Sequence, residues 1–296
     1  MKFNPLSKIM ILLLLLAGCS TSTESEVSQV AEQPQQPPLL VFVTGDHEYS
    51  SERTMPLLAS VMESRYGFRT EVVSAYPDEY SEENIPGLDS LESADLAIFF
   101  LRWRRLPEEQ IKHIEEYLNS GRPIVGFRTT THAFRYPESH PLEEWNEFGA
   151  RFLGAPWIYH YGHESSTDVY KHSEAQGHPI LDGVAGQFHV RSWLYHVLPD
   201  YPPASATVLM MGKSVGPSGR SERVDNPVAW TFQTPAGGRV FTTTMGHPED
   251  FAVEPFQRLV VNGIHWAVGQ PIPTTWEGPL DINVPYEKET ANQSNR

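Results

Sequence analysis

The sequence predicts an α/β domain built on a mostly parallel sheet. Uninterrupted apolar runs at 39–43 and, directly after Asp95, at 96–101 are typical of strands that are buried on both faces. Each run is followed by a segment with apolar residues at helical spacing. Strands that alternate with helices in this way favour a parallel sheet over a β-sandwich or a helical bundle.

The first half of the domain carries the clearest signals. Met55, Leu58 and Met62 lie on one face of the first predicted helix, and Gly67 follows its end. Pro107 opens the second helix, since proline is favoured in a first helical turn. The predicted strands are 39–43, 68–74, 95–101 and 123–127, and the predicted helices are 51–66, 107–119 and 142–153.

The second half is richer in strands. The candidates are 169–170, 206–211, 227–232 and 239–244, followed by a closing amphipathic helix at 256–268. Residues 271–296 are polar and proline-rich, so we expect a tail that either wraps the surface or is disordered. The domain is therefore expected to span 39–270.

The N-terminus reads as a lipoprotein signal peptide covering residues 1–18. Lys2 and Lys8 precede an apolar run at 9–17, which is too short to span a bilayer. The run ends in Leu-Ala-Gly-Cys, which resembles the bacterial lipobox and implies lipidation of Cys19. An ordinary signal peptide with an incidental cysteine is the alternative. Residues 19–38 are rich in Ser, Thr, Gln and Pro and are expected to form a flexible tether.

The net charge and the cysteine content exclude several classes of partner and of catalytic chemistry. The formal net charge of -15 argues against nucleic acid as a partner, because a general binder needs a basic face. A single cysteine excludes an internal disulfide and a multi-cysteine zinc cluster. If Cys19 carries lipid, the membrane is a partner and no thiol remains for catalysis. The protein is then expected on the periplasmic side of the cell envelope, and Ser20 favours the outer membrane.

The segments after the predicted strands carry the polar residues. Ligands of open α/β sheets bind at the carboxyl ends of strands, so these segments are expected to converge. The candidate catalytic residues are His132, His247, Asp46 and Glu48, as general acids, bases or hydroxyl acceptors. The candidate substrate-binding residues are Arg102, Trp103, Arg128, Thr129, Thr131, Glu249 and Asp250. The alternatives are structural histidines, a turn cap at Asp46 and surface salt bridges for the arginines.

A candidate metal site lies at His160, His163 and Glu164. The run His-Tyr-Gly-His-Glu supplies two imidazoles and a carboxylate, which are ligands of a zinc-type divalent metal. The spacing differs from the helical His-Glu-x-x-His of zinc proteases. A loop with exposed histidines is the alternative.

Several of these segments together resemble a known family. The motifs GDHEYSSERTM, GFRTTTHAF and GRVFTTTMGHPEDF occur in the order found in the trehalose-utilisation (ThuA-like) family, over 39–269. The resemblance implies a flavodoxin-like doubly wound sheet with helices on both faces and extra strands in the second half, as in class I glutamine amidotransferases. It also implies a role in disaccharide or keto-sugar metabolism.

Glutaminase activity is excluded on chemical grounds. The amidotransferases that the family resembles carry a nucleophilic cysteine on a sharp turn after a strand. The corresponding turn here carries Arg128, whose guanidinium has no lone pair to offer. This cluster is better suited to holding hydroxyls or an oxyanion.

Three classes of function remain. The first is an enzyme of the hydrolase, lyase or isomerase type that acts on a small carbohydrate by acid/base chemistry. The second is a non-catalytic sugar-binding lipoprotein that uses the same cleft, with Trp103, Trp157, Tyr159 and Trp193 as stacking platforms. The third is a structural protein of the envelope. The sequence does not indicate an oligomeric state.

Overall fold

The computed structural model describes residues 36–217 and 223–286, and the fold concerns the unit from residue 37 onward. The predicted signal peptide, the anchor at Cys19 and most of the tether lie outside the described residues. Within the described part of the chain, no helix combines the length and the apolar character that crossing a membrane requires.

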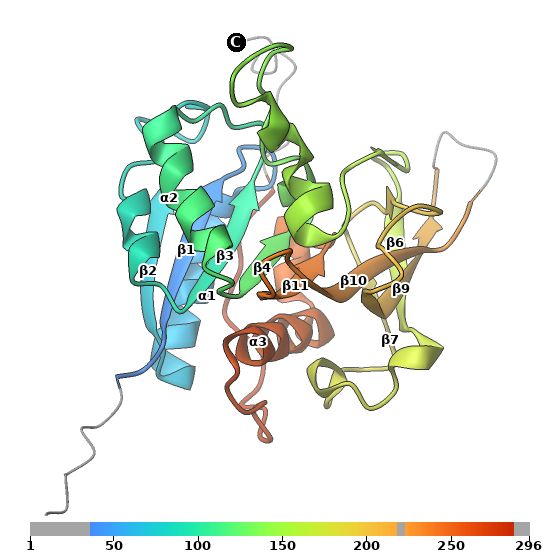
Figure 1. Cartoon of the computed structure of the whole chain (residues 1–296). Helices are drawn as coiled ribbons and strands as arrows, with labels where there is room; N and C mark the ends of the chain where they lie inside the picture. The colour runs from blue at the N-terminus through green and yellow to red at the C-terminus, as the bar shows by residue number, and fades with distance from the viewer. Residues whose placement is uncertain (1–35, 218–222, 287–296) are drawn as a thin grey trace, which may run out of the picture. The chain divides into compact units, whose positions relative to one another are not determined.

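A nine-stranded mixed sheet forms the centre of this unit (Figure 1). Its parallel part consists of β1 (Leu39–Gly45), β2 (Arg69–Ser74), β3 (Leu96–Leu101), β4 (Ile124–Phe127) and β11 (Arg239–Thr243). Its antiparallel part consists of β10 (Asn226–Gln233), β9 (Thr207–Val215), β6 (Ser166–Lys171) and β7 (Gln187–Val190). The strand order is β2-β1-β3-β4-β11-β10-β9-β6-β7, which is doubly wound with extra strands from the second half, as predicted.

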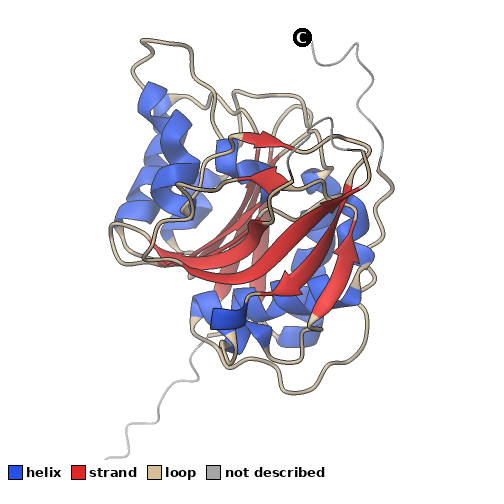
Figure 2. Cartoon of the chain, turned by 90° about the vertical axis from the view of Figure 1, so that its right-hand side faces the viewer, coloured by secondary structure: helices blue, strands red, loops and turns tan. Residues whose placement is uncertain are grey.

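Helices cover both faces of the sheet (Figure 2). The side chains of β1 show why: Leu40 and Phe42 join one apolar cluster, and Val41 and Val43 join another on the opposite face. The first cluster includes residues of α1 (Ser51–Tyr66) and α3 (Glu254–Val268), and the second includes residues of α2 (Glu108–Asn119). Burial on both faces accounts for the unbroken apolar run that identified this strand.

The helix predicted over 142–153 is present from Glu143 to Leu153 but is not a regular α-helix. It consists of a 3-10 helix η3 (Glu143–Glu147) followed by a π-helix η4 (Gly149–Leu153). A Cβ at Gly149 would collide with the carbonyl oxygens of Thr131 and Ala155. The backbone at Gly149 therefore lies closer to η2 (Arg128–His132) than a residue with a side chain would allow.

Further short elements complete the fold. The strands β5 (Tyr159–His160) and β8 (Tyr195–His196) form a small second sheet that the sequence did not predict. The remaining short helices are η1 (Leu88–Glu92), η2 (Arg128–His132), η5 (Ser173–Ala175), η6 (Pro179–Leu181) and η7 (Pro248–Ala252).

Residues 271–286, which we name the C-terminal strap, pack against the domain. Leu280, Ile282 and Val284 are buried at alternate positions, and the first two belong to the same core cluster as α1 and α3. The backbone of Leu280 exchanges two hydrogen bonds with the side chain of Gln257. The packed unit thus continues beyond residue 270.

Candidate functional site

The predicted site residues gather at the carboxyl edge of the parallel strands. In the strand order β2-β1-β3, the chain crosses from one side of β1 to the other, which is the topological switch where ligands of such sheets bind. Two groups of side chains occupy this edge. The charged cluster consists of Asp46, His47, Glu48, Glu52, Arg102 and Arg104; the aromatic–histidine cluster consists of Tyr49, Arg128, His132, His160, His163, Trp193, Tyr195 and His247.

His47 is held between two arginines of the charged cluster. Its Nε2 lies 2.9 Å from Nη1 of Arg102, and its Nδ1 lies 2.9 Å from Nη2 of Arg104. A neutral imidazole has one acceptor nitrogen, so it accepts from one guanidinium at a time. Burial, followed by the charges of Arg102, Arg104 and Arg135, lowers the pKa of His47 to about 3. The ring is therefore neutral at physiological pH.

Arg102 links this cluster to the rest of the site. Its Nε lies 2.8 Å from the carboxylate of Glu48, and its guanidinium lies 3.4 Å from the ring centroid of Trp103. The guanidinium of Arg135 lies 4.1 Å from the same centroid, so two cations pack against the Trp103 ring. In this arrangement Trp103 positions Arg102.

Two carboxyl groups lie deeper in the charged cluster. Asp46 is fully buried, and one of its oxygens accepts from the backbone N–H of Glu48, which is the turn cap considered as an alternative. Burial and the charges of Glu48 and Glu52 raise the pKa of Asp46 to about 8. The pKa of Glu52 is also raised, chiefly by burial. Asp46 is therefore largely protonated at neutral pH.

Arg128 occupies the turn at the carboxyl end of β4. It directly follows β4, has a φ of 39°, and is fully buried. Its guanidinium donates to the carbonyl oxygen of Thr244 at 2.8 Å and to the hydroxyl of Tyr49 at 3.0 Å. The rings of Tyr49, Trp193 and Tyr195 lie 4.3, 5.0 and 4.6 Å from it. The elbow thus holds a cation inside an aromatic cage.

His247 is a neutral hydrogen-bond donor in this structure. Its Nδ1 accepts from the backbone N–H of Glu249 at 3.2 Å, which places the ring proton on Nε2. Burial, followed by the charges of Arg128 and Arg191, lowers its pKa to about 3. The side chain is fully buried, and Nε2 has no hydrogen-bond partner among the described residues.

Asp250 holds the His247 segment in place. Its carboxylate accepts from the backbone N–H groups of Ser192, Gly246 and His247 and from the hydroxyl of Ser192. Both oxygens are thereby engaged by the protein, and the residue is fully buried. Glu249, in contrast, is exposed. The geometry gives Asp250 a positioning role; a direct contact with substrate stays a prediction.

His132 carries its proton on the other nitrogen. The hydroxyl of Thr131 donates to the carbonyl oxygen of Arg128 at 3.0 Å and lies 3.3 Å from Nδ1 of His132. Since that hydroxyl has only one proton, Nδ1 donates to it and Nε2 keeps a lone pair. Burial, followed by the charges of Arg102 and Arg128, holds the pKa of His132 well below its usual range. His132 is therefore a neutral acceptor. Thr129 is fully buried beside it.

The structure brings His160 and His163 together. Nδ1 of His160 lies 2.6 Å from the carbonyl oxygen of Tyr161, so Nδ1 is protonated and Nε2 is the acceptor nitrogen. Nε2 of His163 lies 3.2 Å from this acceptor, at hydrogen-bond distance. Among the described residues no group of three metal-binding side chains forms, so Glu164 does not join the pair as a third ligand. The metal site stays a prediction.

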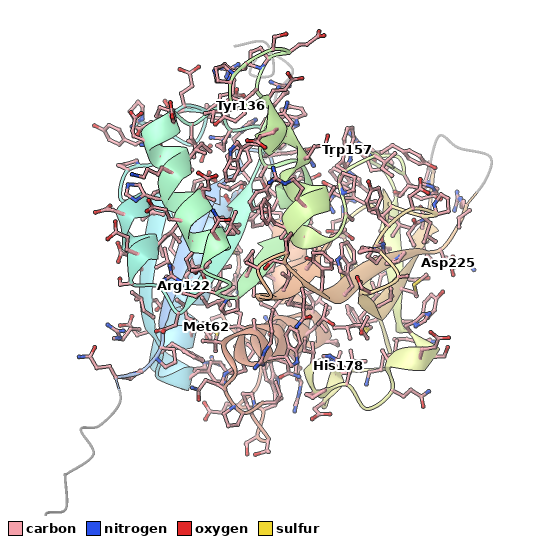
Figure 3. All side chains as sticks on the ribbon, in the orientation of Figure 1. Met62, Arg122, Tyr136, Trp157, His178 and Asp225 are labelled. Atoms are coloured by element: carbon pink, nitrogen blue, oxygen red, sulfur yellow. The ribbon has the colours of Figure 1, made fainter. Side chains whose placement is uncertain are left out.

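Three of the predicted stacking residues, Trp157, Tyr159 and Trp193, differ in how far their rings are exposed to solvent. Trp193 is buried, and Tyr159 stacks on His196 at 4.4 Å. Trp157 is 37% exposed, and its ring lies 5.2 Å from that of His132 and 6.2 Å from that of His160. Figure 3 shows it at the same end of the sheet as Tyr136. Trp157 is thus the accessible aromatic surface beside the histidines.

A hollow of about 700 Å³ adjoins the charged cluster at His47. Tyr76 and Tyr80 line it and are 61% and 41% exposed. A second hollow of about 700 Å³ shares Glu83 and Arg105 with the first. The molecule therefore has room for a ligand beside His47 and Arg105.

Sequence reasoning missed several members of the site. His47 and Glu52 flank residues that were selected from the same GDHEYSSE motif, and their burial could not be read from that motif. Tyr195 belongs to a strand too short to leave a periodic signal. Tyr286 approaches His247 from the C-terminal strap, where the alternation Leu280, Ile282, Val284 was the available signal.

Strand order, two-sided helix layers and the switch-point site define a flavodoxin-like protein of the class I glutamine amidotransferase-like type. Residues 39–267 match the family ThuA, described as trehalose utilisation. The chain therefore belongs to the ThuA family. A search of curated proteins finds no match.

Two solved structures of ThuA-like proteins are similar to this chain. One, from Parabacteroides merdae, has a TM-score of 0.60 at 18% identity and covers 86% of this chain and 100% of its own. The other, from Bacteroides uniformis, has a TM-score of 0.55 at 17% identity and covers 78% of this chain and 91% of its own. At these identities the likeness shows the fold.

Proposed function

We propose that this protein is an envelope-anchored enzyme that acts on a small carbohydrate, a disaccharide or keto-sugar, by acid/base chemistry without a cysteine nucleophile. One observation carries the proposal: His132 and His247 are neutral and carry their protons on opposite nitrogens. One offers a lone pair and the other an N–H at a single edge of the sheet. Membership of a family described as trehalose utilisation supports the substrate class.

The two histidines would divide the work of moving a proton. His132 would accept a proton from a sugar hydroxyl at Nε2, and His247 would donate a hydrogen bond from Nε2 to the oxygen where negative charge develops. A neutral histidine can act as such a donor when its surroundings suppress its pKa. The charge of Arg128 lowers the pKa of both rings and favours a developing oxyanion.

The neighbouring residues would bind the sugar. The carboxylate of Glu48 is positioned by Arg102 and can accept sugar hydroxyls. The exposed ring of Trp157 offers a flat apolar face beside His132. A zinc-type metal at His160 and His163 would polarise a substrate oxygen, with ligands beyond the pair supplied by water or substrate.

Anchoring through Cys19 is the second part of the proposal. The lipobox-like segment and the tether support a lipid-anchored protein on the periplasmic side, with the outer membrane favoured. Replacing Cys19 with alanine should move the protein from the membrane fraction to the soluble fraction and abolish labelling with a palmitate analogue. Unchanged labelling of the variant would contradict the assignment.

Catalysis is tested with paired variants. Purified protein is incubated with trehalose, other disaccharides and their keto derivatives, and products are followed by mass spectrometry. His132→Ala and His247→Asn should abolish turnover, whereas His189→Ala, an exposed histidine paired with Asp168, should not. Full turnover in both site variants would overturn the proposal.

A non-catalytic sugar-binding lipoprotein is the second candidate. It is favoured by the low pKa values of both histidines, which make them weak bases. Calorimetry that detects binding, lost in Trp157→Leu, together with no product from any sugar would support this candidate over the enzyme.

A further inference from the structure

The hollow beside His47 lies where three neighbouring parallel strands end. His47 follows β1, Tyr76 follows β2 and Arg105 follows β3, and all three residues line the hollow. The ends of these strands are paired with one another, so the segments that follow them meet at one edge of the sheet. The volume of about 700 Å³ falls within the range of small-molecule sites, about 300–1,000 Å³. Both the position and the size of the hollow suit a bound ligand.

The wall of the hollow is held in place by hydrogen bonds, chiefly those of Arg104. This arginine is fully buried; its Nη1 donates to the carbonyl oxygen of Ser81 at 3.0 Å, and its Nη2 lies 2.9 Å from Nδ1 of His47. The segment from Tyr76 to Asn84 is also closed on itself, because the backbone N–H of the first donates to the carbonyl oxygen of the second at 3.1 Å. The residues that line the hollow therefore stand on a fixed scaffold.

The lining combines an exposed aromatic ring with carboxylates. Tyr76 is 61% exposed, so much of its ring is open to a ligand. Asp78, Glu82 and Glu83 also line the hollow. Arg105 is the only lysine or arginine among the described residues of the lining, and it pairs with Glu83 at 3.1 Å. The lining therefore carries an excess of negative charge, which repels an anionic ligand.

A neutral sugar fits this lining. Its hydroxyl groups donate hydrogen bonds, which carboxylate oxygens accept, and the apolar face of its ring packs on an aromatic ring. A phosphorylated sugar offers the same ring but brings a negative charge next to the carboxylates.

Arg102 connects the hollow with the histidines of the proposed function. Its guanidinium lies 2.9 Å from His47 and packs on the ring of Trp103. The ring of Trp103 in turn lies 6.1 Å from that of His132. Side-chain contacts thus run without a break from the hollow to His132.

We propose that the hollow beside His47 is a binding subsite for a neutral sugar unit, with Tyr76 as its stacking residue. The carboxylates of the lining accept the hydroxyl groups of this unit, and their charge disfavours phosphorylated sugars. The choice of a sugar rests on the proposed function. The subsite deepens that function, because it specifies an unphosphorylated ligand with a second unit beyond the one at the histidines.

Calorimetry with trehalose tests the subsite. Tyr76→Ala should weaken binding about tenfold, because the stacking ring is lost. Tyr76→Phe keeps the ring and should bind as the wild type does. Leu57→Ala, which truncates an exposed apolar side chain on α1, is the matched control. All three changes lie on the surface, so melting temperatures should stay nearly unchanged. Wild-type affinity in Tyr76→Ala, or no binding of trehalose to the wild type, would overturn the subsite.

Trehalose 6-phosphate tests the preference for a neutral ligand. At low salt it should bind at least about fivefold more weakly than trehalose, and the difference should shrink as salt screens the carboxylates. Glu83→Gln, which removes one exposed carboxylate of the lining, should also narrow the difference. Equal affinities of the wild type for the two sugars at low salt would overturn the preference.

Turnover separates the subsite from the proposed function. Tyr76→Ala should raise KM about tenfold and leave kcat nearly unchanged, as expected of a residue that binds the substrate and the transition state equally. If trehalose binds in a way that depends on Tyr76 but is not converted, the proposed catalysis fails and the subsite stands. If His132→Ala abolishes turnover while Tyr76→Ala changes neither KM nor binding, the subsite fails and the proposed function stands.

Discussion

The two halves of the candidate site are built on opposite principles. In the charged cluster, Arg102 and Arg104 converge on His47, and Glu48 pairs with Arg102. In the aromatic–histidine cluster, the guanidinium of Arg128 is surrounded by rings and by backbone carbonyls. The first half offers charges in fixed positions, and the second offers the neutral imidazoles of His132 and His247 beside aromatic rings.

The difference suggests a division of labour. The paired charges of the first half suit the orientation of hydroxyls and of developing negative charge. The neutral rings of His132 and His247 in the second half suit proton acceptance and hydrogen-bond donation, because burial suppresses their charged forms. Burial shifts acids and bases in opposite directions, since it raises the pKa of Asp46 and lowers that of His247.

The largest expected loss of stability comes from replacing Asp250, which supports the aromatic–histidine cluster. Asp250→Ala deletes the acceptor of four hydrogen bonds and leaves the buried backbone N–H groups of Ser192 and Gly246 without their acceptor, whereas the N–H of His247 keeps the hydroxyl of Ser192. We expect the free energy of unfolding to fall by about 3 kcal/mol or more, measured by urea denaturation. Glu249→Ala, at the exposed neighbouring position, should change it by less than about 0.5 kcal/mol. Equal losses of stability in the two variants would contradict the role of Asp250 in holding the His247 segment.

The next prediction concerns the pH dependence of stability, to which Asp46 in the charged cluster and His247 in the aromatic–histidine cluster contribute with opposite sign. Asp46 keeps its proton in the folded protein up to about pH 8, whereas the unfolded chain releases it near pH 3.8. Its contribution is therefore fully present below pH 3.8 and is lost as the pH rises toward 8, with a slope of up to about 1.4 kcal/mol per pH unit. Asp46→Asn should remove this decline, measured by urea denaturation at several pH values. Asp168→Asn, at an exposed site, should retain it.

His247 should show the opposite sign. Its pKa is about 3 in the folded protein and 6.5 in the unfolded chain, so its contribution is present above pH 6.5 and is lost as the pH falls toward 3. His247→Asn keeps an acceptor for the N–H of Glu249 but cannot titrate, and should therefore flatten the acid side of the stability profile. An unchanged acid side would show that His247 is already charged or exposed.

A metal ion bound at His160 and His163 would add a fixed positive charge to the aromatic–histidine cluster. Zinc titration followed by calorimetry should detect binding that His160→Ala and His163→Ala each weaken by about tenfold or more, because each removes one of two nitrogen ligands. His189→Ala is the control. Binding that neither variant changes would leave the second half metal-free.

The smallest expected effect compares two tryptophans. Trp103→Leu should cost about 0.5–1 kcal/mol of stability through the lost contacts with Arg102 and Arg135. Trp157→Leu should leave stability nearly unchanged and weaken sugar binding, because its ring is exposed. The reverse pattern would exchange the roles assigned to these residues.

The sequence predicted the parallel core well, because burial on both faces leaves a continuous apolar run. It also placed His132 and His247 at strand ends. It failed where a long-range contact decides the structure. Gly149 packs closely against the carbonyl oxygen of Thr131, within a helix whose type the sequence did not predict, and Asp250 receives its hydrogen bonds partly from Ser192, far away in the chain. Proton positions on the histidines depend on such contacts and cannot be read from residue types.

His132 and His247 carry their protons on opposite ring nitrogens, and nitrogen NMR of histidine-labelled protein can observe this difference. At neutral pH, Nε2 of His247 should give a protonated, pyrrole-type signal and its Nδ1 an unprotonated, pyridine-type signal. His132 should show the reverse. His247→Asn and His132→Ala assign the signals. A spectrum in which both rings share one tautomer, or in which either is charged, would contradict the account.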